Sequence, residues 1–443
     1  MFAMAELAHE EGTMPDNSFR FIHAADIHID SPLRGLESYP GAPIERLRNA
    51  TRKAFENLVQ IAIDEAVAFV IIAGDLFDGQ WKDMNTGIWT ADQFRKLGRA
   101  GIPVCLIRGN HDAESKVRTS IKWPPNVHEF SVRIPGTLMS EQLGLTNSPT
   151  VAIHGQGFAK PDIQEDLAAG YPTAVPGCFN IGVLHTSLTG DPTHDRYAAT
   201  TLDVLRNRGY DYWALGHVHI RSEPPLSETP FIAFSGNTQG RHIRETGAKG
   251  CLLVSIEDGN ISETEFRETE TLRWHRASIV LNQPDSLNEL YEKTRITLQE
   301  CLDNSDGRFS AVRIEVSGSC AAHRELVQPG VQDEIVTQIR DIANEWDDEI
   351  WIEKVKLNTS PPLDVDQLRQ GNDLLGELLR DVENLAADQD QLAVLVSESM
   401  TSLAAKTAPE LHAAGISLTD SAQLKTWLQQ AAGLLLARLE SEA

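Results

Sequence analysis

The sequence predicts an α/β protein with a mostly parallel sheet, followed by a small α+β unit and a helical segment. Three times in the first 112 residues an apolar stretch runs into a short polar cluster, and helical periodicity separates these stretches. The middle stretch, residues 69–73, is apolar throughout, which is typical of a strand buried on both faces of a sheet. This alternation of strand and helix predicts βαβ units.

The elements of the first domain follow from the apolar pattern. Helices are expected where apolar side chains recur at helical spacing, and strands where short apolar runs end in polar residues. In chain order we expect a strand over 19–25, a helix over 44–68, a strand over 69–73, a helix over 86–100, strands over 102–107, 151–155 and 179–184, a helix over 200–208, an apolar stretch from 212 and a strand over 231–234. Residues 251–256 and 261–266 should pair across Asp258-Gly259-Asn260.

The pattern changes near Glu270. A compact βαβαβ unit is expected from strands over 274–281, 310–316 and 349–357, with helices over 287–302 and 331–346. Beyond Pro361 and Pro362 the sequence is rich in Leu, Ala and acidic residues with helical patterning. The chain therefore divides into a disordered leader (1–18), a first domain (19–268), an α+β capping domain (269–360) and a helical segment (361–443).

Composition and charge limit the possible functions. The net charge of −25 argues against broad electrostatic binding to nucleic acid, although a local basic groove or a bound metal can reverse the field at a site. The five cysteines are dispersed without CxxC spacing, which indicates reduced thiols rather than a disulfide framework or a zinc finger. The N-terminus lacks the features of a secretion signal, and no apolar run reaches the ~18 residues of a membrane span. We expect a cytoplasmic protein that does not bind membranes.

Candidate ligands for metal ions lie directly after the predicted strands. They combine carboxylates, imidazoles and one amide: Asp26, His28, Asp75, Asn110, His185, His217 and His219. Because the strand ends of a parallel sheet meet at one edge, these side chains are expected to converge. Seven ligands are too many for one four-coordinate ion, and they suit two metals that share a carboxylate at about 3.5–4 Å.

Each residue also has a simpler interpretation. A single His at a strand end is usually a satisfied polar residue, and an isolated Gly-Asp such as Gly74-Asp75 is usually a helix-capping aspartate. The Gly-His-x-His pair at residues 216–219 is more specific, because two imidazoles on the same side rarely serve packing. Five clusters in this order, each after a strand, favour the two-metal interpretation.

The order Asp-x-His, Gly-Asp, Gly-Asn-His-Asp, His and Gly-His-x-His resembles the calcineurin-like metallophosphoesterase superfamily over residues 19–265. Within it, the chain is similar to the bacterial DNA repair exonucleases of the SbcD and YhaO kind, and the YhaO branch fits best. The stretches that carry this likeness are residues 26–36, 184–190, 211–217 and 235–245. The resemblance implies a four-layer α/β/β/α sandwich, to which the capping domain and the C-terminal helices are added.

The resemblance also implies a role for each residue. It assigns Asp26, His28 and His219 to a first metal, Asn110, His185 and His217 to a second, and Asp75 to a bridge between them. A hydroxide between the metals would attack phosphorus. His111 would not bind metal but would stabilise or protonate the leaving oxygen. The two divalent ions are expected to be Mn²⁺, with Fe, Mg or Zn as alternatives.

Other polar residues near these clusters have open roles. Asp78 stands where some relatives carry a substrate-orienting histidine, and it would orient His111 or a metal-bound water, or simply serve as a turn residue. Candidate contacts to a phosphate backbone are Arg241, His242 and Arg244, with Arg34 and Arg108 as further possibilities. For each arginine the alternative is a solvated surface side chain. His194 would touch substrate or cap a turn.

We therefore expect a Mn-dependent DNA exonuclease, with possible endonuclease capacity, that acts in DNA repair. One alternative is a metallophosphoesterase acting on nucleotides or small phosphodiesters, and another is a non-catalytic regulatory subunit of an ATPase complex. Residues 361–443 carry several leucine clusters, which suit docking to an SMC-like ATPase subunit or a small bundle that completes the fold. A homodimer is also possible.

Overall fold

The structure is a computed structural model. It describes residues 18–32, 36, 39–79, 83–114, 121–145, 150–188, 197–328, 330–362, 374–388, 391–392, 394–395, 424–425 and 427–428. The chain forms two compact units. One comprises Met1–Arg276, Cys301–Val312 and Asp348–Glu353, and the other comprises Ala277–Glu300, Arg313–Asp347 and Lys354–Ala443.

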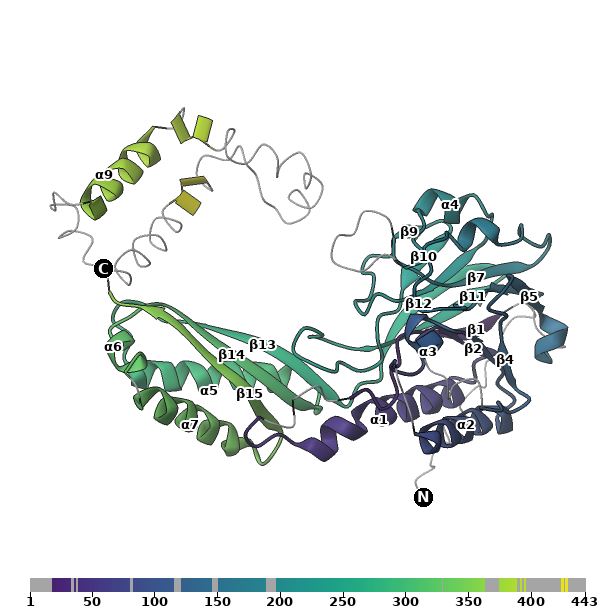
Figure 1. Cartoon of the computed structure of the whole chain (residues 1–443), viewed down its shortest axis with the longest axis horizontal. Coiled ribbons are helices and arrows are strands. Elements are labelled where there is room, and N and C mark those ends of the chain that lie inside the picture. Colours follow the sequence, from purple (N-terminus) through teal and green to yellow (C-terminus); the bar gives the residue numbers. More distant parts are fainter. Residues whose placement is uncertain are drawn as a thin grey trace, which may run out of the picture. The chain divides into compact units, whose positions relative to one another are not determined.

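Two six-stranded sheets form the first unit (Figure 1). The first sheet has the order β12-β11-β1-β2-β3-β4, and its last four strands are parallel. Its strands are β1 (Phe19–Ala24), β2 (Phe69–Ala73), β3 (Val104–Ile107), β4 (Val127–Glu129), β11 (Gly250–Glu257) and β12 (Asn260–Glu268). As expected, β11 and β12 pair as an antiparallel hairpin.

The second sheet has the order β5-β6-β7-β8-β10-β9, with a parallel centre and antiparallel edges. Its strands are β5 (Gly136–Met139), β6 (Val151–Gly155), β7 (Phe179–His185), β8 (Tyr212–Gly216), β9 (Ser227–Glu228) and β10 (Phe231–Phe234). The central strands β6, β7 and β8 are buried at every position, which accounts for their mostly apolar sequences.

The two sheets pack face to face, and helices cover the outer faces. Side chains from β1, β2, β6, β7 and β8 fill the space between the sheets, among them Phe21, Ile71, Ile153, Ile181 and Ala214. Helices α1 (Ile44–Asp64) and α2 (Met84–Arg99) cover the outer face of the first sheet. Helix α4 (Leu202–Arg206) and the 3₁₀ turn η4 (Ala168–Gly170) pack on the outer face of the second. The architecture is thus an α/β/β/α sandwich.

The expectation that all strand ends meet at the edge of one parallel sheet was wrong. Strands β1, β2 and β3 belong to the first sheet, whereas β7 and β8 belong to the second. Every one of these strands is buried on both sides, so the apolar pattern is the same in both sheets. The sequence pattern alone therefore could not assign strands to sheets.

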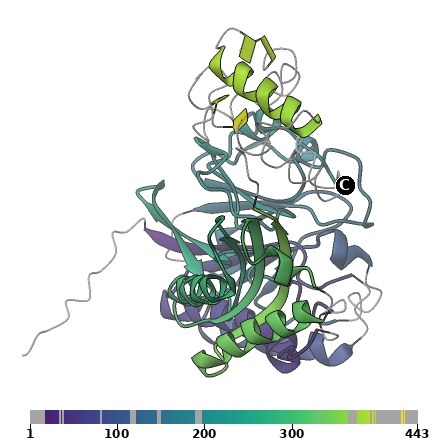
Figure 2. The same cartoon turned by 90° about the vertical axis from the view of Figure 1, so that its left-hand side faces the viewer.

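A third sheet has the order β13-β14-β15, with β13 (Leu272–Val280), β14 (Phe309–Ser319) and β15 (Ile350–Ser360). Helices α5 (Leu287–Asp303) and α7 (Val331–Ala343) lie against one face of these strands in both views (Figures 1 and 2). The short elements are α3 (Asn110–Glu114), α6 (His323–Leu326), η3 (Ser140–Leu143) and η5 (Asn344–Trp346). The expected βαβαβ order is present.

Beyond residue 362 the structure describes one long helix, α9 (Leu374–Ala387), and a few short pieces. The expected leader falls outside the described residues except for Ser18, as does most of the segment beyond α9. Among the described residues, no helix is both long and apolar enough to cross a membrane.

Candidate metal centre

Loops at the ends of five strands meet beside the two sheets. On the first sheet, Asp26 and His28 follow β1, Asp75 follows β2, and Asn110 follows β3. On the second sheet, His185 ends β7, while His217 and His219 follow β8. The loops after β1 and β2 run side by side, because the Asp26 N–H donates to the Gly74 carbonyl at 3.1 Å and the His28 N–H to the Asp75 carbonyl at 3.0 Å.

Four of these residues have left-handed backbone conformations. The φ angles are 51° at Asp26, 47° at His28, 51° at Asp75 and 103° at His217. Such conformations are uncommon for residues other than glycine and concentrate at functional sites. They turn the chain sharply after the strands, which brings the side chains toward one another.

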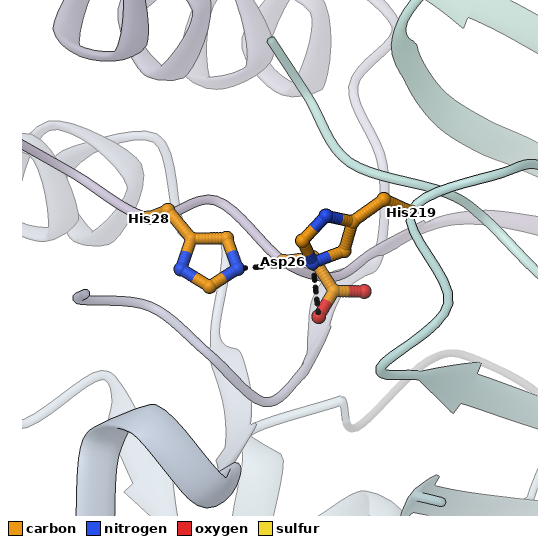
Figure 3. A group of neighbouring side chains, drawn as sticks. All are labelled: Asp26, His28 and His219. Atoms are coloured by element: carbon orange, nitrogen blue, oxygen red, sulfur yellow. Dashed lines mark hydrogen bonds and ion pairs between the residues drawn. The ribbon is translucent and has the colours of Figure 1, made fainter. Parts of the chain in front are cut away.

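Asp26, His28 and His219, here called the first cluster, point at a common position (Figure 3). The His28 and His219 Nε2 atoms lie 3.2 Å apart, and His219 Nε2 lies 3.9 Å from Asp26 Oδ1. Burial and the nearby Arg241 charge lower the pKa of His28 well below its ordinary value. Neutral imidazole nitrogens and a carboxylate that face each other are the ligand set of a divalent cation.

Glu245 holds the outer nitrogen of His219, with 2.8 Å between His219 Nδ1 and Glu245 Oε1. The carboxylate of Glu245 is buried and also binds Arg241 and Asn237. Burial would raise the pKa of Glu245, but the bond from His219 and the charge of Arg241 outweigh it and lower that pKa. The sequence pattern gives no sign of this role of Glu245, because nothing in its local sequence relates it to a histidine 26 residues away.

Asn110, His185 and His217 form the second cluster, on the other side of Asp75. His185 is fully buried; its Nδ1 lies 2.9 Å from the Ala73 carbonyl oxygen and its Nε2 lies 2.9 Å from Asn110 Oδ1. The His217 ring lies edge-on to the His185 ring at 5.3 Å between centroids. Because the Ala73 carbonyl only accepts, His185 carries a proton on Nδ1, and its Nε2 faces the inside of the cluster.

Asp75 lies between the two clusters. Its Oδ2 atom is 3.4 Å from His185 Nε2 in the second cluster and 3.9 Å from His28 Nε2 in the first. Burial would raise the pKa of Asp75, but His185 outweighs burial and lowers that pKa to about 2. In the same way burial would lower the pKa of His185, but Asp75 outweighs it and raises that pKa to about 9. The ionised Asp75 carboxylate therefore favours a positive charge beside it, in the space that it shares with His185.

Glycines allow the loops to approach this closely. A Cβ atom on Gly109 would lie 2.1 Å from Asp75 Oδ1, and one on Gly74 would lie 2.5 Å from His185 Nδ1. Gly74 also has a φ of 95°, which disfavours other residues. Asp112 adds a further link between the loops, since its carboxylate accepts the backbone N–H groups of Leu76, Phe77 and Gly109.

His111 lies beside the first cluster. Its ring is edge-on to the His28 ring at 5.0 Å, and its Nδ1 lies 2.9 Å from Asp78 Oδ1. Its backbone N–H donates to Asp75 Oδ1 at 2.9 Å. Burial would lower the pKa of His111, but the bond to Asp78 outweighs it and raises that pKa. With 31% of its side chain exposed, His111 can reach a molecule bound outside the clusters.

Asp78 is fixed by several partners. Ser31 Oγ donates to Asp78 Oδ2 at 2.6 Å, and Arg241 Nη1 lies 3.6 Å from the same oxygen. Burial would raise the pKa of Asp78, but the hydrogen bonds from His111 and Ser31 outweigh it and lower that pKa. An ionised Asp78 accepts from the Nδ1–H of His111 and directs Nε2 away from the carboxylate, and the raised pKa of His111 favours the imidazolium, in which Nε2 also carries a proton.

The residues expected to contact substrate differ in their surroundings. Arg241 is largely enclosed and pairs with Glu245, while Arg244 is exposed and His242 is about half exposed. Arg108 pairs with Glu129 at 2.6 Å between Nε and Oε1. His194 and Arg34 lie outside the described residues.

Comparisons with known proteins agree with this geometry. The family of calcineurin-like phosphoesterases matches residues 19–221, and the middle domain of metallophosphoesterase YhaO matches residues 274–360. A Bacillus subtilis (strain 168) protein described as "Uncharacterized metallophosphoesterase YhaO" is 33% identical over 332 residues, which are 75% of this chain and 79% of that protein. This chain belongs to the YhaO-like metallophosphoesterases.

Among solved structures, this metallophosphoesterase is similar to TT1561 of Thermus thermophilus. The TM-score is 0.32 and the identity 13%, over 56% of this chain and 99% of that chain. Family membership makes the protein a metal-dependent phosphoester hydrolase. Metallophosphoesterases of this fold normally bind two divalent metals.

The residues present fit two divalent ions. In the first cluster two imidazole nitrogens face each other at 3.2 Å, and at most one proton can lie between them. In the second, His185 Nε2 faces an amide oxygen and a carboxylate oxygen. In each cluster, atoms that can serve as metal ligands surround one position, which a cation would satisfy. The mixed imidazole and carboxylate donors suit Mn, Fe or Zn.

Proposed function

We propose that this metallophosphoesterase is a two-metal phosphodiesterase that cleaves DNA, a Mn-dependent exonuclease of DNA repair with possible endonuclease capacity. The observation that carries the proposal is the position of Asp75. One oxygen of this carboxylate faces His185 on one side and His28 on the other, at 3.4 and 3.9 Å. Such a shared carboxylate is the arrangement of two-metal phosphatases and nucleases.

In this proposal the first cluster would hold one Mn²⁺, the second cluster would hold the other, and Asp75 would contribute to both positions. When bound, such ions polarise a phosphate and lower the pKa of water. The protein supplies the rest of the chemistry through His111. Its Nε2 donates a proton to the leaving oxygen, and Asp78 keeps the ring in the orientation that allows this.

The choice of DNA rests on the resemblance to DNA repair exonucleases in residues 26–36, 184–190, 211–217 and 235–245. Arg244 supports it, because an exposed arginine in the segment that precedes Glu245 suits a phosphate backbone. We propose that His242 and His194 also contact the substrate, and His194 lies outside the described residues. Since the net charge is −25, attraction of DNA depends on such local groups and on the metals.

One observation favours a second candidate, hydrolysis of nucleotides or small phosphodiesters. Arg108 pairs with Glu129, and Arg241 pairs with Glu245, so two of the arginines considered for backbone contacts are neutralised internally. A small ester would need few contacts beyond the metals and His111.

End-labelled DNA distinguishes the two candidates. The purified protein, loaded with Mn²⁺, is incubated with single- and double-stranded labelled DNA and, in parallel, with a chromogenic phosphodiester. Shortening of labelled DNA that EDTA abolishes would support the exonuclease. Hydrolysis of the chromogenic ester without DNA cleavage in any divalent metal would contradict it and favour the second candidate.

We further propose that residues 361–443 dock an SMC-like ATPase subunit. Two apolar side chains in this segment are exposed, with 54% of Val394 and 40% of Leu395 accessible to solvent. The acidic surplus of the segment would repel DNA, which suits a protein partner better. A homodimer formed through the same segment is the competing assembly, and the mass of the purified complex separates the two.

A further inference from the structure

Glu245 accepts hydrogen bonds on both of its oxygens. Oε1 accepts from Arg241 Nη2 at 2.9 Å and lies 2.8 Å from His219 Nδ1. Oε2 accepts from the Arg241 backbone N–H at 2.7 Å and from Asn237 Nδ2 at 3.1 Å. A buried carboxylate with this many donors is held in one position and remains ionised.

These contacts fix the proton on His219. An ionised carboxylate only accepts, so His219 Nδ1 must carry the proton at 2.8 Å from Glu245. Arg241 Nη2 also lies 3.2 Å from His219 Nδ1, but an arginine only donates, and the shorter contact is with Glu245. The Nε2 atom of His219 therefore keeps its electron pair, which points toward His28 and Asp26 (Figure 3).

Arg241 joins two carboxylates that serve different parts of the centre. One side of its guanidinium contacts Glu245, which holds His219, and Nη1 lies 3.6 Å from Asp78 Oδ2. Asp78 in turn holds His111. Without the guanidinium, both buried carboxylates would lose a counter-charge, and each would be held by fewer donors.

We propose that Glu245 and Arg241 are positioning residues of the metal centre. Glu245 sets the tautomer and orientation of His219 for the first metal, and Arg241 holds Glu245 and Asp78 in place. Arg241 therefore acts inside the protein rather than mainly as a contact to the DNA backbone. This inference rests on the proposed two-metal function. In it, Glu245 and Arg241 determine how tightly the first cluster binds its metal.

The test measures Mn²⁺ binding to the metal-free full-length protein by calorimetric titration, without any substrate. His28→Ala and His185→Ala assign the two binding events to the first and second clusters. We expect Glu245→Ala to weaken the first event about 10–100-fold, as loss of a carboxylate behind a metal-bound histidine typically does, and to leave the second unchanged. Glu245→Gln should weaken it less, because the amide oxygen can still accept from His219. Glu263→Ala, an exposed glutamate on β12, is the matched control.

Arg241→Gln separates positioning from DNA contact. We expect it to weaken the first Mn²⁺ event in the absence of DNA, by less than Glu245→Ala does. Unchanged Mn²⁺ affinity together with weaker DNA binding would overturn the role of Arg241.

Two results with Glu245→Ala would overturn the proposal. One is a Mn²⁺ affinity at the first position equal to that of the unaltered protein. The other is an equal loss of affinity at both positions, which would indicate general damage to the fold. If the unaltered protein binds fewer than two Mn²⁺ ions, the two-metal function itself fails, and the inference fails with it. Two normal binding events in Glu245→Ala would refute the inference alone.

Discussion

The two clusters of the metal centre are held in different ways. In the first, the outer nitrogen of His219 is fixed by the Glu245 side chain, and 24% of the His219 side chain is exposed. In the second, the outer nitrogen of His185 is fixed by the Ala73 main-chain carbonyl, and the ring is fully buried. The first position thus depends on a replaceable side chain, whereas the geometry of the second is part of β2 and β7. We expect the first metal to exchange more readily than the second.

Asp75→Asn should remove the difference between the clusters by weakening both. The amide keeps the size of the carboxylate and can still accept the His111 N–H, but it loses the charge that faces His185 and His28. We expect both Mn²⁺ ions to bind more weakly. The activation barrier of hydrolysis should rise by several kcal/mol, so that the rate falls on the order of 10³-fold or more. Metal analysis beside the rate checks this. Full occupancy of both positions would refute the bridging role.

Removing one histidine from each cluster should sharpen the difference. His28→Ala is expected to empty chiefly the first position, and His185→Ala chiefly the second. His185 is buried where β7 meets β2. Its loss should therefore lower the free energy of unfolding by about 1–3 kcal/mol more than the loss of His28 does. Metal content and thermal unfolding of the two variants test this. Identical metal losses in both would show that the clusters are not separate sites.

His111→Ala should leave both clusters loaded. Its assigned task is proton transfer, which is worth typically about 10²–10⁴-fold in rate, so turnover should fall by that factor. Calorimetry with Mn²⁺ and the rate of phosphodiester cleavage are measured on the same preparation. A collapse of metal binding would mean that His111 is itself a ligand and that the division of roles is wrong.

Deleting residues 363–443 should affect neither cluster, because all described members of both lie before residue 220. We expect the shortened protein to bind two Mn²⁺ ions, to keep its hydrolytic rate and to lose co-purification with the proposed SMC-like ATPase subunit. Pull-down from cells that express both proteins provides the measurement. Unchanged partner binding would contradict the docking role, and aggregation would indicate that the segment completes the fold.

Much of the fold could be predicted from the apolar pattern. Strands β2, β6 and β10 begin and end at the expected residues, because each is a short, mostly apolar run that ends at a glycine or just before a glycine or polar residue. The apolar pattern could not show their division into two sheets, since strands buried on both faces have similar sequences whichever sheet they belong to, and only the resemblance to the superfamily implied two β layers. The edge strands β4, β5 and β9 were missed because they are short and at most partly buried.

The centre was predictable to the extent that its residues follow strands. Asp26, Asp75 and His185 stand directly after or at the ends of apolar runs, and the structure brings them together. Glu245 has no such signal, since it lies in a loop beyond β10 and reaches His219 only through the tertiary fold. The same holds for Arg241, whose guanidinium could not be distinguished from a surface group until its carboxylate partners were known.

The division of the ligands between two sheets has a consequence for the lifetime of the folded protein. An ion bound by both sheets is a reversible cross-link between them, and it exists only in the folded state. At a free metal concentration of 100 times the dissociation constant, one such ion adds about 2.7 kcal/mol to the free energy of unfolding. Loss of the metal would therefore lower the free energy of unfolding as well as stop hydrolysis. The free metal concentration in the cell would then determine how long the protein stays folded.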